Sequence, residues 1–173
     1  MAKYVELRRH TDADGDVLTP DGVHAALEIG SRLTGGYDLL VSTGAQRATQ
    51  TLACFLAGLG EKVPQAVVVE PGLRSGVEDR WRAAYEKAGS GALEALRDAD
   101  PELVEEDSAA LAAALRRVLD RLPEGGRALV AGHSPTNEAA VLGLTGESVE
   151  PISKGEGVLV VEEEGAVRVE KLD

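Results

Sequence analysis

Apolar residues along the chain follow two alternating patterns: short runs of strand length, and longer segments with helical spacing. The short runs are rich in Val and Leu, which favours strands. They predict strands over Lys3–Arg9, Asp38–Ser42, Ala66–Glu70, Arg127–Ala131, Gly157–Val161 and Ala166–Leu172. The longer segments predict helices from Pro20 to Gly35 and over Gln46–Leu59, Ser108–Leu122 and Thr136–Leu144, with weaker helical patterns over Val77–Ala88 and Gly91–Asp98.

Capping and turn residues mark where several of these elements begin and end. Thr19 is a predicted N-cap, and Pro20 suits the first helical position that follows it. The pair Gly35-Gly36 ends that helix. Pro101 is expected to break the helical pattern in the middle of the chain. Near the C-terminus, Glu164-Gly165 is the predicted turn of a hairpin.

The alternation of strands and helices predicts an α/β three-layer sandwich. Strands that are separated by helices form a mostly parallel sheet, with helices on both faces. The closing hairpin adds an antiparallel edge strand. A chain of 173 residues suits one domain, which we expect to cover residues 1–173.

Composition and charge narrow the setting in which the protein acts. Hydrophobic residues make up 43% of the chain and aromatic residues only 3%, so Leu, Val and Ala must build the core. The net charge of -12 disfavours general binding to nucleic acid or to anionic membranes, because the long-range field repels both. Cys54 is the one cysteine, so no intrachain disulfide is expected. With neither a signal-peptide pattern nor an apolar stretch of about 20 residues, we expect a cytoplasmic protein.

Polar residues that can carry chemistry follow three of the predicted strands. Arg9-His10-Thr11 follows the first strand, and Gly132-His133-Ser134 follows the fourth. Ser42-Thr43 follows the second strand, with Arg47 just inside the next helix. In open α/β sheets, ligands bind beyond the carboxyl ends of the strands. If these strands are neighbours, two of the chain's three histidines meet two arginines in one site.

Four segments, in this order, resemble the motifs of the histidine phosphatase superfamily, also called phosphoglycerate mutase-like. Leu7-Arg8-Arg9-His10-Thr11 is similar to its Arg-His-Gly signature, and Leu18-Thr19-Pro20-Asp21-Gly22 to its Leu-Thr-x-x-Gly segment. Residues 41–51, VSTGAQRATQT, resemble its Ser-x-x-x-Arg-x-x-Gln-Thr block, and Gly132-His133 resembles its late Gly-His. The order and spacing agree over nearly the whole chain.

The resemblance implies a metal-independent phosphatase, in which His10 attacks phosphorus and the resulting phosphohistidine is hydrolysed by water. A neutral imidazole can do this at physiological pH, because its pKa lies near neutrality. Arg9 and Arg47 are expected to bind the phosphoryl oxygens with paired donors, and Ser42 to donate a further hydrogen bond. A protonated His133 would add a third cation. Because the arginines supply the charge that Mg²⁺ supplies in kinases, no metal and no other cofactor is expected.

Two positions depart from the family pattern. Thr11 stands where the signature usually has glycine, and a side chain there can narrow the pocket or shift the backbone around His10. Ser75 falls about where the best-known relatives have the glutamate that protonates the leaving group. Glu78 and Asp79 are the nearest acids, and Glu78 is slightly favoured as the general acid, given a raised pKa in a partly buried site. Asp79, or no acid at all, is the alternative.

The short chain and the unassigned acid favour a small phosphatase of the phosphohistidine phosphatase or α-ribazole phosphatase kind. Its partner would be a small phosphorylated substrate or a phosphohistidine protein, with no nucleic acid and no membrane; a homodimer stays open. Two alternatives are a phosphoglycerate mutase-type phosphoryl transferase and a phosphate-binding pseudoenzyme with a regulatory role. His24 is interpreted as a surface or structural residue, and Cys54 as part of the core.

Overall fold

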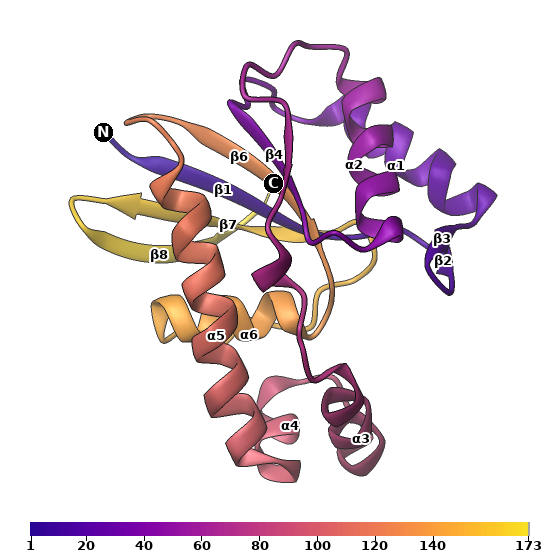
Figure 1. Ribbon diagram of the computed structural model, residues 1–173, viewed down its shortest axis with the longest axis vertical. Coiled ribbons are helices and arrows are strands. Elements are labelled where there is room, and N and C mark those ends of the chain that lie inside the picture. The colour runs from indigo at the N-terminus through magenta and orange to yellow at the C-terminus, as the bar shows by residue number, and fades with distance from the viewer. Residues whose placement is uncertain (173) are drawn as a thin grey trace.

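A six-stranded sheet runs through the molecule (Figure 1), and this computed structural model describes residues 1–172. The strands are β1 (Lys3–Arg9), β4 (Leu39–Ser42), β5 (Val67–Val69), β6 (Arg127–Gly132), β7 (Gly157–Glu163) and β8 (Ala166–Lys171). They lie in the order β5-β4-β6-β1-β7-β8. The first four pair in parallel, whereas β7 is antiparallel to β1 and β8 is antiparallel to β7. The predicted mostly parallel sheet with an antiparallel edge strand is therefore confirmed.

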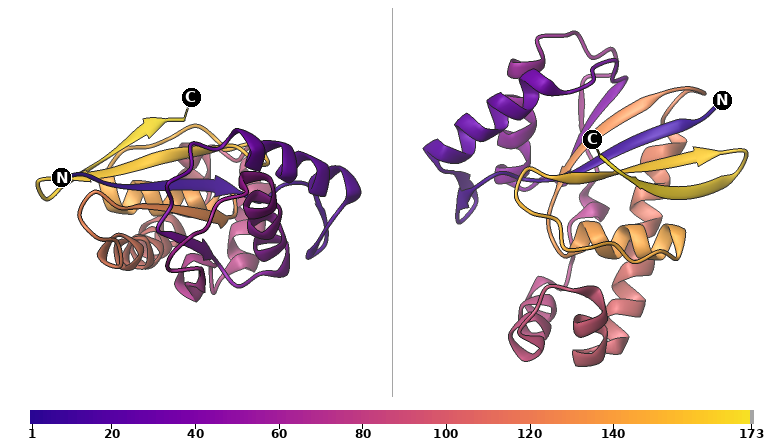
Figure 2. Two further views of the ribbon diagram at one scale, coloured as in Figure 1. Left: turned by 90° about the horizontal axis from the view of Figure 1, so that it is seen from above. Right: turned by 180° about the vertical axis from the view of Figure 1, so that it is seen from behind.

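Helices cover both faces of the sheet, as Figure 2 shows from two further sides. One face carries α1 (Pro20–Arg32) and α2 (Gln46–Leu59), and the other carries α5 (Pro101–Asp120) and α6 (Thr136–Thr145). Successive residues of a strand point to opposite faces. Accordingly Leu40 packs in the core beneath α2, whereas its neighbours Leu39 and Val41 pack in the core beneath α5. The predicted three-layer arrangement is confirmed.

The first two helices cross at short range, at the C-terminal half of α2. Glycines stand at the crossing, because the helices leave no room for a side chain there. A Cβ atom on Gly30 would lie 2.5 Å from the carbonyl oxygen of Phe55, and one on Gly58 would lie 2.3 Å from that of Leu27.

The segment between β1 and α1 contains a small hairpin that the sequence pattern does not predict. Its strands are β2 (Ala13–Asp14) and β3 (Val17–Leu18), which pair antiparallel. The predicted start of α1 is confirmed directly after it. The hydroxyl of Thr19 accepts a hydrogen bond from the backbone N–H of Gly22 at 3.0 Å, and Pro20 takes the first helical position.

Below the sheet in Figure 1, α3 (Glu78–Ala88) and α4 (Leu93–Ala99) pack beside the N-terminal half of α5, after a 3-10 turn, η1 (Pro71–Leu73). The expectation that Pro101 breaks the helical pattern is wrong. Pro101 takes the first position of α5, where its missing N–H costs nothing. Asp100 caps the helix by accepting from the N–H of Leu103 at 3.2 Å. The long helix therefore begins at Pro101 and not at Ser108.

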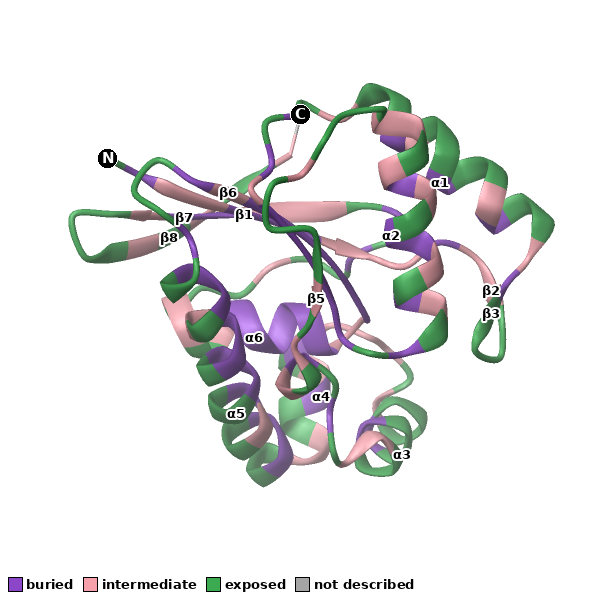
Figure 3. Ribbon diagram, turned by 45° about the horizontal axis from the view of Figure 1, so that its top comes forward, coloured by how far each residue is buried: buried purple, intermediate pink, exposed green. Residues whose placement is uncertain are grey.

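Burial differs between the helices. Figure 3 shows α6 buried along most of its first two turns, whereas α3 and α5 expose one side.

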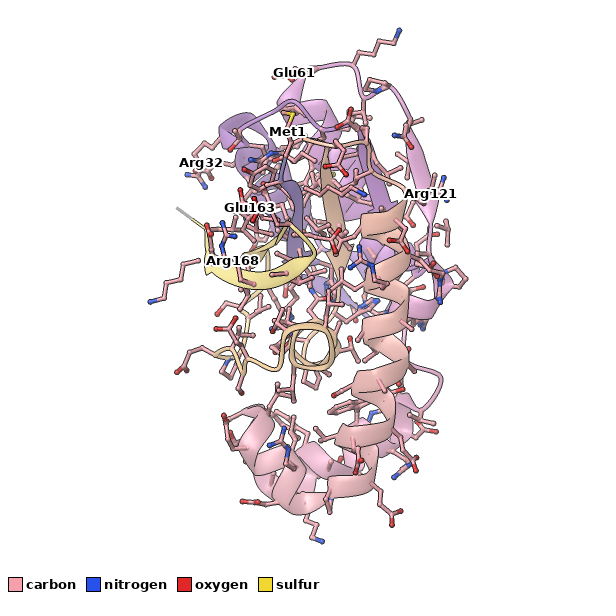
Figure 4. All side chains as sticks on the ribbon, turned by 90° about the vertical axis from the view of Figure 1, so that its left-hand side faces the viewer. Met1, Arg32, Glu61, Arg121, Glu163 and Arg168 are labelled. Atoms are coloured by element: carbon pink, nitrogen blue, oxygen red, sulfur yellow. The ribbon has the colours of Figure 1, made fainter. Side chains whose placement is uncertain are left out.

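Charged side chains such as Arg32 and Glu61 lie at the periphery in Figure 4. His24 is exposed on α1, and Cys54 is half-buried beside the core beneath α2. No helix among residues 1–172 combines the length and the apolar character needed to cross a membrane.

Candidate active site

The carboxyl ends of β1, β6 and β4 meet at one edge of the sheet, because these three strands are neighbours. This arrangement brings His10 and His133 together, with ring centroids 5.4 Å apart and ring planes inclined by 59°. The charge of Arg47 acts on both imidazoles, and the charges of Arg9 and Lys154 act on His10. Two histidines and several cations thus share one site.

The His10 ring has one nitrogen bonded and the other available. Its Nδ1 lies 2.7 Å from the carbonyl oxygen of Thr11, which accepts a hydrogen bond, so Nδ1 carries the ring proton and Nε2 keeps its electron pair. Burial lowers the pKa of His10, and the charges of Arg47 and Arg9 lower it further, which outweighs the opposing effect of the Thr11 hydrogen bond. The imidazole is therefore neutral near pH 7, the form that acts as a nucleophile.

His133 is only 8% exposed. Its Nε2 lies 2.8 Å from the hydroxyl of Thr43, and its Nδ1 has no partner among the described residues. Because that hydroxyl accepts from the N–H of Ala45 at 3.4 Å, its own proton can go to Nε2, which leaves the ring proton on Nδ1. Burial lowers the pKa of His133 to about 3, with contributions from the charges of Arg47 and His10. The expected third cation is therefore corrected to a neutral hydrogen-bond donor.

Two arginines flank the histidines. Arg9, the last residue of β1, donates from Nη1 to the carbonyl of Ile152 at 3.1 Å, while its buried Nε has no partner within residues 1–172. Arg47 donates from Nη1 to Asp16 at 2.8 Å. The same carboxylate accepts from the backbone N–H groups of Gln46 and Arg47, both at 3.2 Å, and so holds the start of α2. Both guanidinium groups keep further N–H donors for an anion.

A cavity of about 250 Å³ opens beside His133. Its walls come from the start of α2, the loop before α3, one face of α3 and the loop between β6 and α6. The lining residues are Arg47, Ser75, Glu78, Trp81, Arg82, Tyr85, His133, Ser134, Pro135 and Thr136. Positions 78, 81, 82 and 85 lie three or four residues apart, so they form one face of the helix.

The acidic candidates lie in different places. Glu78 lines the cavity and accepts a hydrogen bond from Nε of Arg74 at 2.7 Å. The side chain of Asp79 is 95% exposed and lies outside that cavity, which removes it as an alternative acid. Ser75 also lines the cavity and donates to Asp107 at 2.7 Å. In the part of the chain that the structure describes, no three His, Cys, Asp or Glu side chains are grouped to hold a metal ion.

The structure does not support the expectation that Ser42 binds phosphate, because its hydroxyl is used inside the protein. Ser42 is fully buried, its hydroxyl pairs with that of Thr49 at 2.8 Å, and it accepts from the N–H of Gly44 at 3.0 Å. Thr43 instead contacts the second histidine. Neighbouring residues at a strand end point in opposite directions. In the family block Ser-x-x-x-Arg, the serine stands four residues before the arginine. Counting back from Arg47, that position is Thr43 and not Ser42, so the spacing itself favours Thr43.

The side chain of Thr11 does not narrow the site. Its hydroxyl donates to the carbonyl of Gly22 at 2.8 Å, and its backbone N–H donates to the hydroxyl of Thr51 at 3.2 Å. Thr11 therefore joins the end of β1 to α1 and α2, and it is not among the residues that line the cavity. Its carbonyl is the group that holds the His10 ring.

A buried carboxylate lies behind the site. Glu138, on α6, is fully buried, and its Oε2 accepts from the hydroxyl of Ser134 and from the N–H of Ile152 at 3.4 Å. Its Oε1 has no partner among the described residues. Burial raises the pKa of Glu138, against the effects of these hydrogen bonds and of the charge of Arg9. In the sequence, Glu138 is the one charged residue of the helix Thr136–Thr145.

The protein is an α/β sandwich in which two histidines lie side by side at the carboxyl ends of parallel strands. Solved structures share this fold over nearly the whole chain. Phosphoglycerate mutase from Bacillus anthracis str. Sterne is 18% identical with a TM-score of 0.71, covering 99% of this chain and 92% of that one. Bacillus stearothermophilus YhfR is 17% identical with a TM-score of 0.72, covering 96% and 95%. Phosphoserine phosphatase from Entamoeba histolytica, in complex with 3-phosphoglyceric acid, is 18% identical with a TM-score of 0.71, covering 96% and 94%.

These structures are members of the histidine phosphatase superfamily, so the resemblance inferred from the motifs is confirmed at the level of the fold. The chain has the phosphoglycerate mutase-like fold. No family model and no curated protein sequence matches it.

Proposed function

We propose that this protein is a phosphatase that hydrolyses a small phosphate monoester or a phosphohistidine, through a phosphohistidine intermediate on His10 and with no metal ion in the chemical step. The observation that carries this proposal is the His10 imidazole itself. It is neutral, its Nδ1 is held by the Thr11 carbonyl, and it faces His133 inside a group of cations. The shared fold supports the same reading, because its members include a phosphoserine phosphatase.

In the first half-reaction, Nε2 of His10 attacks phosphorus as the bond from phosphorus to the leaving group breaks. Negative charge is spread over the three equatorial oxygens of the phosphoryl group. Arg9 and Arg47 each use Nη1 in one hydrogen bond within the protein, which leaves further guanidinium N–H groups to donate to those oxygens. The Nδ1–H of His133, buried and without a partner among the described residues, would add a neutral donor if the phosphoryl group reaches it. Donors fixed in advance stabilise the transition state without reorganising during the reaction.

In the second half-reaction, water attacks phosphorus, the bond to Nε2 breaks, and inorganic phosphate leaves. The adjoining cavity of about 250 Å³ accommodates a small organic group or the tip of a phosphohistidine side chain. The position of Thr11 removes one reason for considering a non-catalytic phosphate-binding protein, since its side chain leaves the site open.

Hydrolysis of p-nitrophenyl phosphate by the wild type and by His10→Ala tests the proposal, with His24→Ala as the matched control on an exposed histidine. Turnover should disappear in the first variant and persist in the second. A phosphoprotein that is stable in base and labile in acid should be trapped only when His10 is present. A folded wild type that binds phosphate without turning over a panel of phosphate esters would indicate a binding protein. Transfer to a second hydroxyl without release of inorganic phosphate would indicate a transferase.

A further inference from the structure

The leaving group of a phosphate monoester needs a proton as its bond to phosphorus breaks, because an alkoxide is a poor leaving group. Glu78 is the carboxylate in the cavity wall, but it is bonded to Arg74, and both side chains are about 40% exposed. A more deeply buried carboxyl group would be a better source of the proton.

Ser134 lines two neighbouring cavities close to the two histidines. It follows His133 directly and lines the cavity of about 250 Å³ that also contains Arg47. It lines a neighbouring cavity of about 330 Å³ as well, whose wall contains Arg9. Ser134 and Pro135 are thus shared between the cavities that hold the two arginines. The Ser134 hydroxyl is therefore close to the space between the two arginines, where a phosphoryl group would be bound under the proposed function.

Behind Ser134, Glu138 has the environment of a proton store. The hydroxyl of Ser134 is hydrogen-bonded to its Oε2, and Oε1 is buried with no partner. The partners of Glu138 among residues 1–172 are the uncharged hydroxyl of Ser134 and N–H of Ile152, although the charge of Arg9 acts on it from β1. A buried carboxyl group without a paired cation favours the protonated form, and the raised pKa of Glu138 agrees with this.

We infer that Ser134 and Glu138 form a proton relay, in which Ser134 protonates the leaving group and Glu138 replaces the proton from behind. This inference rests on the proposed phosphatase function and supplies the acid that function requires. Ser134 is the residue that touches the substrate, and Glu138 acts through it.

The relay balances over one turnover. The relay starts from the protonated carboxyl group, in which Oε2 of Glu138 donates to Oγ of Ser134 and the Ser134 proton is free to turn toward the substrate, the reverse of the hydrogen bond that the carboxylate form accepts. As the N–P bond to His10 forms and the P–O bond breaks, the leaving oxygen takes the proton of the Ser134 hydroxyl, which takes the proton on Oε2 of Glu138. Glu138 is then a carboxylate. When water attacks the phosphohistidine, a water proton goes to Ser134 while the Ser134 proton goes to Glu138, and the N–P electron pair returns to Nε2. The enzyme is restored with no other reactant.

The test measures how kcat/KM depends on the basicity of the leaving group, using p-nitrophenyl phosphate and unsubstituted phenyl phosphate. The p-nitrophenolate ion leaves without a proton, whereas phenolate needs one. Glu138→Gln and Ser134→Ala should each lower kcat/KM for phenyl phosphate about 10²-fold and for p-nitrophenyl phosphate less than about threefold. The double variant should lose no more than either single variant, because both interrupt one relay.

Glu78→Gln is the matched comparison, since it removes the other carboxyl group of the site. It should change both substrates by the same factor. Selective loss on phenyl phosphate in Glu78→Gln, or equal losses on both substrates in Glu138→Gln and Ser134→Ala, would overturn the relay. Ser134→Ala removes one hydroxyl from a half-buried position, so it decides the question even where Glu138→Gln fails to fold. Failure of the phosphatase proposal would show separately, as turnover that survives in His10→Ala.

Discussion

The buried, neutral His133 makes the stability of the fold depend on pH. On unfolding, the pKa of its imidazole returns from about 3 to the ordinary value of 6.5. Between these two values, the unfolded chain binds a proton that the folded chain excludes. The free energy of unfolding therefore falls as the pH falls below the unfolded value, and the contribution is fully present above it. From about pH 7 to about pH 4, the two values give a loss of about 3 kcal/mol.

Urea unfolding at these two pH values measures the loss, in buffers without phosphate or sulfate. The wild type should lose about 3 kcal/mol more than His133→Gln. His10 and the carboxylates titrate in both proteins, so their contributions cancel in the comparison. His24→Gln, which removes an exposed imidazole, should retain the pH dependence of the wild type. If the wild type and His133→Gln lose the same free energy within about 1 kcal/mol, His133 is not held neutral by the fold, and it cannot serve as the neutral donor of the mechanism.

Arg9→Ala and Arg47→Ala should each lower kcat/KM about 10²-fold, and a change below about threefold with p-nitrophenyl phosphate would count against a role in binding the phosphoryl group. Thr43→Val should lower kcat, because the second histidine loses the partner of its Nε2. In contrast, Ser42→Ala should keep kcat/KM within about threefold and cost about 1 kcal/mol of unfolding free energy, and the reverse pattern in the same two assays would restore Ser42 as the ligand. Gly30→Ala should lower the unfolding free energy by about 1–3 kcal/mol in urea titrations, and an unchanged midpoint would show that α1 and α2 are less closely packed.

Regular periodicity explains where the fold could be predicted. The alternating run at Lys3–Arg9 and the amphipathic run at Gln46–Leu59 have the predicted bounds, because side-chain burial on the sheet decides both. Pro101 misled the prediction, since proline ends a helix in its interior but suits its first turn. The hairpin β2–β3 is too short to show any periodicity.

The candidate site was predictable only as far as the strand ends. Ligands bind beyond the carboxyl ends of parallel strands, and this rule predicts that His10, Arg47 and His133 lie in one site. Sequence alone does not show whether the side chain of Ser42 or that of Thr43 points toward the histidines. Successive side chains along a strand point in opposite directions, so an error of one residue reverses the answer. The role assigned to Glu138 depends on how deeply the first turn of α6 is buried and on the contact with Ile152, which only the tertiary structure reveals.

The cavity wall that α3 forms comes from a different part of the chain than the histidines and arginines of the candidate site. The reacting groups are anchored at strand ends inside the sandwich, whereas the surface that would meet the organic part of a substrate belongs to a helix outside it, supported by α4 and the first half of α5. Under the proposed function, substitutions on the cavity-facing side of α3 should therefore change which substrate is preferred, while His10 and the two arginines keep their positions.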